Sequence, residues 1–135
     1  MLRAAVAALL FALIGCHRSA GPPAIELGSS CATCSMDVSD LRFACERETD
    51  KGWLVYDSIE CLMRDDPGGR IALADYETKT LHFAESVWLV HGSFPSPMGG
   101  GYAAFVSRAA ADSIAQQTNG EVMRLAERLA RAERK

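Results

Sequence analysis

Turn-forming residues divide the chain from residue 41 onward into short segments, and this division limits the folds open to it. Four clusters interrupt the apolar pattern: Asp50-Lys51-Gly52, Pro67-Gly68-Gly69, residues 95–101 and Asn119-Gly120. Between these clusters, short β-branched and aromatic runs alternate with helical patterns. The chain has 135 residues, which favours a single domain. We therefore expect an α+β fold of short strands and helices.

Five strands are expected, at residues 41–46, 52–56, 71–75, 87–90 and 102–106. The turn at Asp50-Lys51-Gly52 would join the first two as a hairpin. Asp57 and Glu60 have the spacing of a capping box, so a helix is expected to begin after Asp57. Pro67 would end it.

Two further helical segments are expected near the C-terminus. Ser107 is an N-cap residue for a helix over 108–117, and Asn119-Gly120 provides its C-cap. In the tail, Val122, Leu125 and Leu129 have helical spacing. Glu127 and Arg131 stand four residues apart and would form an ion pair on that helix.

The N-terminus has the features of a secretion signal. Arg3 is followed by an apolar run over residues 4–14, which is too short to span a bilayer but matches the apolar core of a signal peptide. The run ends in Leu13-Ile14-Gly15-Cys16, which resembles the bacterial lipobox. We expect a lipoprotein signal over 1–15, lipidation of Cys16, a Ser/Gly/Pro-rich tether over 16–30 and a domain over 31–135. The protein would then be anchored in the bacterial cell envelope, facing the periplasm or the cell exterior.

Charge and motif content exclude several functions. Fourteen Lys and Arg residues stand against seventeen Asp and Glu, giving a net charge of −3. Such a chain has no basic surplus to neutralise nucleic-acid phosphates. The sequence contains no GxSxG, HExxH or phosphate-loop motif, so we do not expect an enzyme.

The cysteine and methionine residues give the clearest chemical signal in this sequence. The segment Cys31-Ala32-Thr33-Cys34-Ser35-Met36 places three sulfur side chains within six residues. Thiolates with a thioether select Cu(I), whereas zinc rarely uses methionine. Two readings stay open beside a Cu(I) site: a Cys31–Cys34 disulfide or redox pair, and part of a zinc site.

A second methionine lies in an unusual place. Met98 stands in the Pro/Gly loop Ser96-Pro97-Met98-Gly99-Gly100-Gly101, where burial is not expected. A thioether fixed by such a turn is a candidate Cu(I) ligand. Met63, by contrast, has helical spacing with Ile59 and Leu62 and should pack in the core.

The roles of Cys45, Cys61 and His91 each have more than one interpretation. Cys45 and Cys61 could be free buried thiols or a disulfide, and with Cys31 and Cys34 they could form a four-cysteine zinc site, although the second CxxC pair of zinc ribbons is missing. His91 is a candidate accessory ligand because it stands near the Met98 loop. The alternative for His91 is an ordinary hydrogen-bonded strand residue.

Together these motifs resemble the NosL family of copper lipoproteins, which are accessory to nitrous oxide reductase. After the lipobox, the resemblance is carried by CATCSM at 31–36, YDSIECLM at 56–63, ALADYET at 72–78 and FPSPMGGGYAAF at 94–105. It implies paired ββαβ units like those of the organomercurial-lyase C-terminal fold. It also implies a strand at 121–125, where periodicity alone predicts helix.

Residue by residue, the resemblance implies a copper site formed by Cys31, Cys34, Met36 and Met98. Ser35 stands where the family usually has glycine. The His-rich C-terminal tail of some members is absent, and Cys45 has no counterpart.

The expected function is therefore that of a lipid-anchored Cu(I) metallochaperone. Its implied client is apo-nitrous oxide reductase or another cuproprotein, together with the membrane transporter or assembly complex that serves it. A thiol–disulfide oxidoreductase using Cys31 and Cys34, or a structural zinc scaffold, are the alternatives. Bound copper, bound zinc, or dithiol redox cycling without metal would separate the three.

Overall fold

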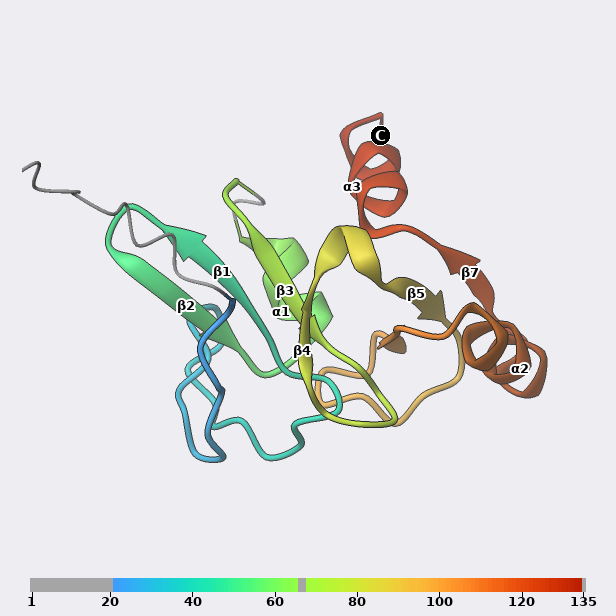
Figure 1. Ribbon diagram of the computed structural model, residues 1–135, viewed down its shortest axis with the longest axis horizontal. Coiled ribbons are helices and arrows are strands. Elements are labelled where there is room, and N and C mark those ends of the chain that lie inside the picture. Colours follow the sequence, from blue (N-terminus) through green and yellow to red (C-terminus); the bar gives the residue numbers. More distant parts are fainter. Residues whose placement is uncertain (1–20, 66–67, 135) are drawn as a thin grey trace, which may run out of the picture.

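The computed structural model describes residues 21–65 and 68–134, so the predicted signal peptide, Cys16 and the start of the tether lie outside the described part. Two antiparallel sheets and the helices between and beside them form the molecule (Figure 1). The α+β class expected from the sequence is confirmed. None of the helices in residues 21–65 and 68–134 has the length and apolar character needed to span a bilayer.

The first sheet contains four strands in the order β2-β1-β3-β4. These strands are β1 (Cys45–Thr49), β2 (Gly52–Tyr56), β3 (Ile71–Ala74) and β4 (Leu81–Phe83). The hairpin of β1 and β2 pairs Cys45 with Tyr56 and Thr49 with Gly52. Helix α1 (Ile59–Arg64) connects β2 to β3.

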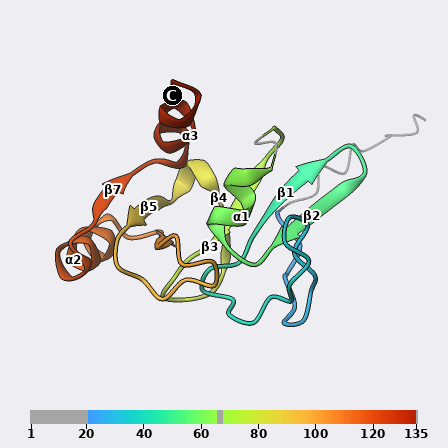
Figure 2. The same ribbon diagram turned by 180° about the vertical axis from the view of Figure 1, so that it is seen from behind.

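The second sheet contains three strands in the order β6-β5-β7. These strands are β5 (Trp88–His91), β6 (Tyr102–Phe105) and β7 (Glu121–Met123). Helix α2 (Arg108–Thr118) connects β6 to β7, and α3 (Leu125–Glu133) follows β7 at the edge of the molecule (Figures 1 and 2). A single 3₁₀ turn, Ala84–Ser86, leads from the first sheet to the second.

The two sheets share one topology. Each begins with a hairpin, crosses through a helix, and adds its third strand on the free side of the first strand, which gives β2-β1-β3 and β6-β5-β7. This arrangement confirms the paired ββαβ units that the family resemblance implied. Strand β4 extends the first unit at its β3 edge.

The two units join where β3 and β6 end. Asp75 and Ala104 form an isolated parallel bridge, and the backbone N–H of Tyr76 donates to the Ala104 carbonyl over 2.7 Å. The buried carboxylate of Asp75 also accepts from the Val106 N–H over 2.9 Å. Backbone hydrogen bonds therefore tie the units together in addition to side-chain packing.

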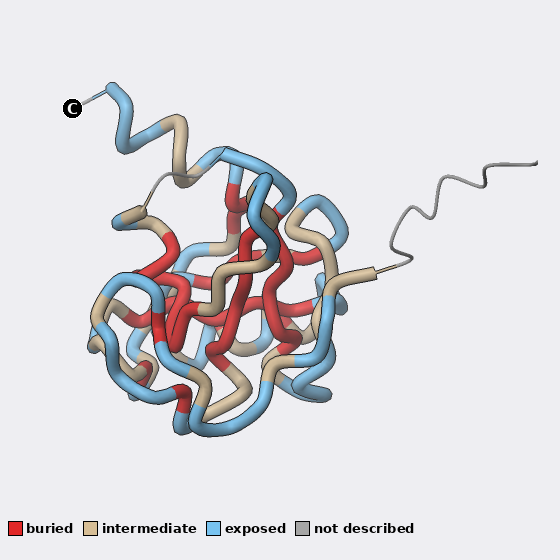
Figure 3. Tube along the Cα trace, turned by 90° about the vertical axis from the view of Figure 1, so that its left-hand side faces the viewer, coloured by how far each residue is buried: buried red, intermediate tan, exposed pale blue. Residues whose placement is uncertain are grey.

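The buried segments of the trace gather in the interior of the molecule (Figure 3). Helix α1 contacts β1 and β2 of the first sheet and β6 of the second. One hydrophobic cluster includes Cys31, Cys61, Leu73 of β3, Leu89 of β5 and Tyr102 of β6, and so spans both sheets. A second cluster packs α2 against β5 and β6 around Phe105 and Ala111.

Two expectations about the first ββαβ unit were wrong. Strand β1 begins at Cys45 instead of residue 41, because Leu41 to Phe43 form a turn closed by the Phe43 N–H on the Asp40 carbonyl. The N-cap of α1 is Ser58, whose hydroxyl accepts from the Cys61 N–H, and not Asp57. The Ser58 hydroxyl therefore caps the first turn of α1, and the Asp57 carboxylate remains available for other contacts.

For residues 121–135 the family resemblance predicted a strand before the last helix, whereas periodicity predicted helix throughout. Strand β7 occupies Glu121–Met123 as the resemblance implied, and helix α3 follows it. The expected Glu127–Arg131 pair does not form. Arg131 instead pairs with Glu121 at 2.9 Å, while the Glu127 carboxylate accepts from the Arg124 N–H at the start of α3.

Candidate metal site

The segment Cys31 to Met36 forms a tight loop, here called the CATCSM loop. The Cys31 N–H donates to the Met36 carbonyl over 2.8 Å, and the Ser35 N–H donates to the Cys31 carbonyl over 2.9 Å. Ser35 has a φ of +63°, in the left-handed region that favours glycine. A glycine at this position would adopt the same turn without steric cost.

Two hydrogen bonds attach the CATCSM loop to the first ββαβ unit. The Ala32 N–H donates to the Val55 carbonyl of the edge strand β2 over 2.8 Å. The Thr33 hydroxyl donates to the Cys61 carbonyl of α1 over 2.9 Å, joining positions 28 residues apart. These bonds bring the two loop cysteines to the first turn of α1.

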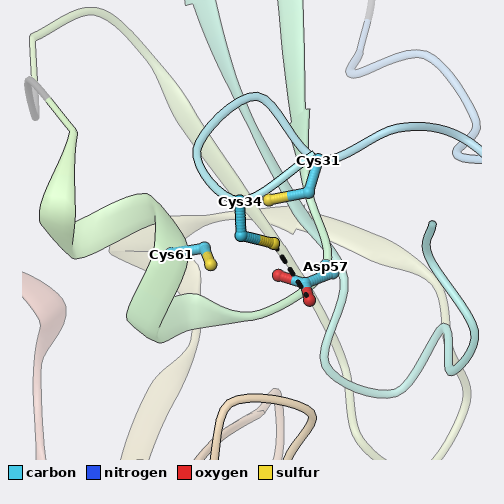
Figure 4. A group of neighbouring side chains, drawn as sticks. All are labelled: Cys31, Cys34, Asp57 and Cys61. Atoms are coloured by element: carbon cyan, nitrogen blue, oxygen red, sulfur yellow. Dashed lines mark hydrogen bonds between the residues drawn. The ribbon is translucent and has the colours of Figure 1, made fainter. Parts of the chain in front are cut away.

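Four side chains converge at this contact: Cys31, Cys34, Asp57 and Cys61 (Figure 4). Their three sulfur atoms and one carboxylate oxygen all lie within 4.8 Å of one another. Cys31, Asp57 and Cys61 are buried, and Cys34 is partly exposed. The group therefore has a closed inner side and one thiol at its rim.

Burial controls the protonation of these thiols. Desolvation raises the pKa of Cys34, and burial raises the pKa of Cys61 strongly. The Cys34 thiol donates to Asp57 Oδ2 over 3.7 Å, and the other Asp57 oxygen, Oδ1, is buried without a hydrogen-bond partner among the described residues. A metal ion that displaces the thiol protons would supply the positive charge that this pocket lacks.

The donor set suits a soft or borderline metal ion. Three thiols can become thiolates, which favour Cu(I) and also bind Zn(II), while the carboxylate oxygen is a ligand that zinc accepts. The raised pKa of Cys34 opposes a dithiol redox role, since reactive cysteines have lowered pKa values. Cys31 and Cys34 themselves lie in a loop and do not begin a helix of their own.

Sequence reasoning missed Asp57 and left Cys61 out of the copper site. Asp57 was interpreted as a helix cap, while Cys61 was grouped with Cys31 and Cys34 only in the four-cysteine zinc alternative. Their spacing of one helical turn, across the start of a predicted helix, could have indicated two ligands on one side. Only the docking of the CATCSM loop shows that they meet the CxxC pair.

Cys45 lies outside the group. It is buried and free, and its thiol faces the Ser58 carbonyl at 3.4 Å. Cys61 is free as well, so the structure contains no Cys45–Cys61 disulfide. Asp57 takes the fourth place that the four-cysteine alternative gave to Cys45.

The other predicted ligands, Met36, Met98 and His91, differ in burial and in what they contact. Met36 ends the CATCSM loop with its residue 47% exposed. Met98 is partly buried against the hydrophobic cluster that contains Cys31 and Cys61. His91 is exposed and stacks on Tyr102 with ring centroids 4.2 Å apart, so it is not a member of the group.

Comparison with solved structures identifies the fold. The chain is similar to the crystal structure of the copper chaperone NosL from Shewanella denitrificans, with a TM-score of 0.69 and 19% sequence identity. The match covers 79% of this chain and 94% of that one. No family model matches the sequence. No curated protein matches it either. The fold implied by the CATCSM and PMGGG motifs is thus the fold that the chain has.

Proposed function

We propose that this protein binds Cu(I) at Cys31, Cys34 and Cys61 and delivers it to an apo-cuproprotein. The observation that carries the proposal is the convergence of these three thiols with Asp57 within 4.8 Å. Two loop cysteines and one helix cysteine come together although the sequence contains no second CxxC pair. Such a meeting of thiols is the donor chemistry that Cu(I) prefers.

The uneven burial of the thiols suits delivery. Cys31 and Cys61 are 2% and 0% exposed, whereas Cys34 lies at the surface of the group. A partner's ligands can reach the ion at Cys34 before the two buried sulfur atoms release it. Met36, on the same loop, is exposed and offers a second kind of sulfur, a neutral thioether. Storage proteins need no such access, so the exposed rim favours a chaperone over a closed structural site.

The thioether of Met98 is a further sulfur ligand of the proposal. It lies in the loop that packs against the same hydrophobic cluster as Cys31 and Cys61. A neutral thioether adds affinity for Cu(I) without adding negative charge to a site that already has three thiols and a carboxylate. His91 has no part in the proposed site.

The client and the anchor are proposed from the family resemblance. The client would be apo-nitrous oxide reductase or a related cuproprotein with its assembly complex, and the described domain would be held at the bacterial membrane through lipidated Cys16 and the tether. Replacing Cys16 by Ala should release soluble or unprocessed protein. Lipid-labelled, membrane-bound Cys16→Ala protein would overturn the anchor while leaving the copper site standing.

A structural zinc site is the second candidate, and Asp57 is the observation that favours it. Three cysteines and one carboxylate form a complete tetrahedral zinc set. On this alternative the ion would stabilise the contact between the CATCSM loop and α1, and it would not be transferred. Copper and zinc therefore predict different occupancy and different exchange.

The deciding experiment is an anaerobic competition titration of the reduced protein with Cu(I) and Zn(II) chelators, followed by transfer to an apo-copper protein. We expect one Cu(I) bound through sulfur in X-ray absorption, in preference to Zn(II), and transfer to the acceptor. A site that prefers zinc, or one that keeps its copper when the acceptor is present, would overturn the chaperone function.

A further inference from the structure

A buried carboxylate, Glu60, directly precedes Cys61 in the sequence and is not a member of the group formed by Cys31, Cys34, Asp57 and Cys61. Glu60, in the first turn of α1, is 6% exposed, and its Oε2 atom has no hydrogen-bond partner among the described residues. A buried carboxylate with an unpaired oxygen lowers stability. A role other than folding would account for a glutamate at this position.

Among residues 21–65 and 68–134, the hydrogen bond to the Glu60 carboxylate comes from the loop of Met98. The buried Ser96 hydroxyl donates to Glu60 Oε1 over 2.6 Å, across 36 residues of sequence. The same hydroxyl accepts from the Gly101 N–H over 3.0 Å. Ser96 thus closes the loop on itself and ties it to α1 through a single oxygen atom.

The loop also lies directly against the Glu60 side chain. A Cβ atom at Gly100 would overlap the Cγ of Glu60 and crowd its carboxylate, so glycine alone fits there without displacement. Gly101 has a φ of +74°, which a residue with a side chain rarely adopts. The run of glycines after Met98 is therefore required by close packing on Glu60 and by backbone angle.

Met98 stands at the corner of a turn within this loop. The Gly99 N–H donates to the Ser96 carbonyl over 2.9 Å, which places Pro97 and Met98 at the two central positions. Proline at the first of these positions fixes the backbone of the turn. The position of Met98 then depends on where Ser96 is held.

From this geometry we infer that Glu60 and Ser96 position the Met98 thioether as a ligand of the copper site. The inference rests on the proposed function. Glu60 directly precedes Cys61, so α1 holds a ligand thiol and the attachment point of the Met98 loop on adjacent residues. Neither Glu60 nor Ser96 contacts the ion. Their effect on copper passes through Met98.

The test compares Cu(I) affinity and the sulfur ligands seen by X-ray absorption. Glu60→Ala and Ser96→Ala should each lower the affinity about tenfold and remove the thioether contribution, as Met98→Leu does. Glu60→Gln keeps an oxygen acceptor for the Ser96 hydroxyl and should stay within about twofold of the parent.

A double variant separates positioning from a merely structural role. In a Met98→Leu background, Glu60→Ala should cause no further loss of Cu(I) affinity, because the residue through which it acts is gone. A further loss of about tenfold in that background would overturn the inference, and so would an unchanged thioether signal in Ser96→Ala. If the parent binds no Cu(I), the proposed function fails instead, and the two failures remain distinct.

Folding is monitored with a control on the same helix. Arg64→Ala replaces an exposed residue of α1 and should leave both affinity and sulfur ligands unchanged. Should Glu60→Ala fail to fold, Ser96→Ala and Glu60→Gln still test the hydrogen bond from its two ends. Full affinity in Ser96→Ala would then reject the inference.

Discussion

The Cys34 thiol donates a hydrogen bond to Asp57 Oδ2 over 3.7 Å, linking the CATCSM loop to the residue just before the N-cap of α1. This contact pairs the most accessible thiol of the site with its single oxygen donor. The two differ in the metals they favour, since the thiolate binds Cu(I) and Zn(II) while the carboxylate favours Zn(II). Asp57 is therefore the residue at which copper and zinc can be told apart.

Replacing Asp57 by Asn removes the anionic oxygen and keeps an acceptor for Cys34. We expect Zn(II) affinity to fall at least about tenfold, and Cu(I) affinity to change less than about threefold, because Cu(I) does not need the hard donor. Competition with a Zn(II) chelator and a Cu(I) chelator measures both. Equal losses for the two ions would show that Asp57 acts on the fold of the site and not on metal choice.

Cys61→Ala tests the thiol that sequence reasoning left outside the site. Cu(I) affinity should fall by about tenfold or more, since a thiolate ligand is lost. Cys45→Ala is the matched control, because Cys45 is also free and buried but lies outside the group. Both variants should lose about 1 kcal/mol of stability from the vacated volume. Similar Cu(I) affinities for the two would remove Cys61 from the ligand set.

Met98→Leu keeps the side-chain volume and deletes the sulfur donor. Stability should change by less than about 1.5 kcal/mol, while Cu(I) affinity or transfer rate should fall about tenfold. Met63→Leu is the control, since Met63 is partly buried on α1 and belongs to no ligand group. If Met98→Leu matches the parent in both affinity and transfer, Met98 has only a packing role.

Ser35→Gly should stabilise the protein. Ser35 holds a φ of +63°, which glycine adopts without steric cost, so we expect a gain of about 0.5 to 1 kcal/mol in the free energy of unfolding. Ser35→Ala keeps the strain and serves as control. Urea denaturation measures both variants. A Ser35→Gly protein no more stable than Ser35→Ala would contradict the strained turn.

Glu46 gives the fold a pH dependence that does not involve the metal site. Burial raises the pKa of Glu46 from 4.5 to about 7, and its Oε1 atom has no hydrogen-bond partner among the described residues. The folded protein therefore holds this proton more tightly than the unfolded chain does. Stability should fall by up to about 3 kcal/mol as the pH rises from the unfolded pKa to the folded one.

Glu46→Gln should remove this loss and be more stable than the parent at pH 8. Glu48→Gln, on the same strand, is the control: its partner Arg70 lowers the pKa of Glu48, so its contribution has the opposite sign. Denaturation midpoints between pH 4 and 8 provide the measurement. A parent whose stability does not decline over that interval would show that Glu46 is ionised in the fold without penalty.

Local signals in the sequence determined much of the fold. Strand β2 occupies residues 52–56 as predicted, since a turn and a β-branched aromatic run define it. Ser107 caps α2, and Asn119 ends it with a φ of +50°. Such features depend on hydrogen bonds and backbone angles within a few residues, which the sequence contains in full.

The sequence also indicated the CxxC pair and the soft-metal chemistry of the site, because the number and type of sulfur atoms are properties of the chain itself. Only the tertiary structure decided which residues complete the site. Asp57 and Cys61 join it because the Thr33 hydroxyl bonds to the Cys61 carbonyl and the Ala32 N–H bonds to β2. Tertiary packing also decides the partner of Arg131, which pairs with Glu121 of β7 and not with Glu127 of its own helix. Contacts between residues distant in sequence depend on how whole helices and strands pack. That packing depends on the sum of many weak interactions, which a short sequence pattern does not predict.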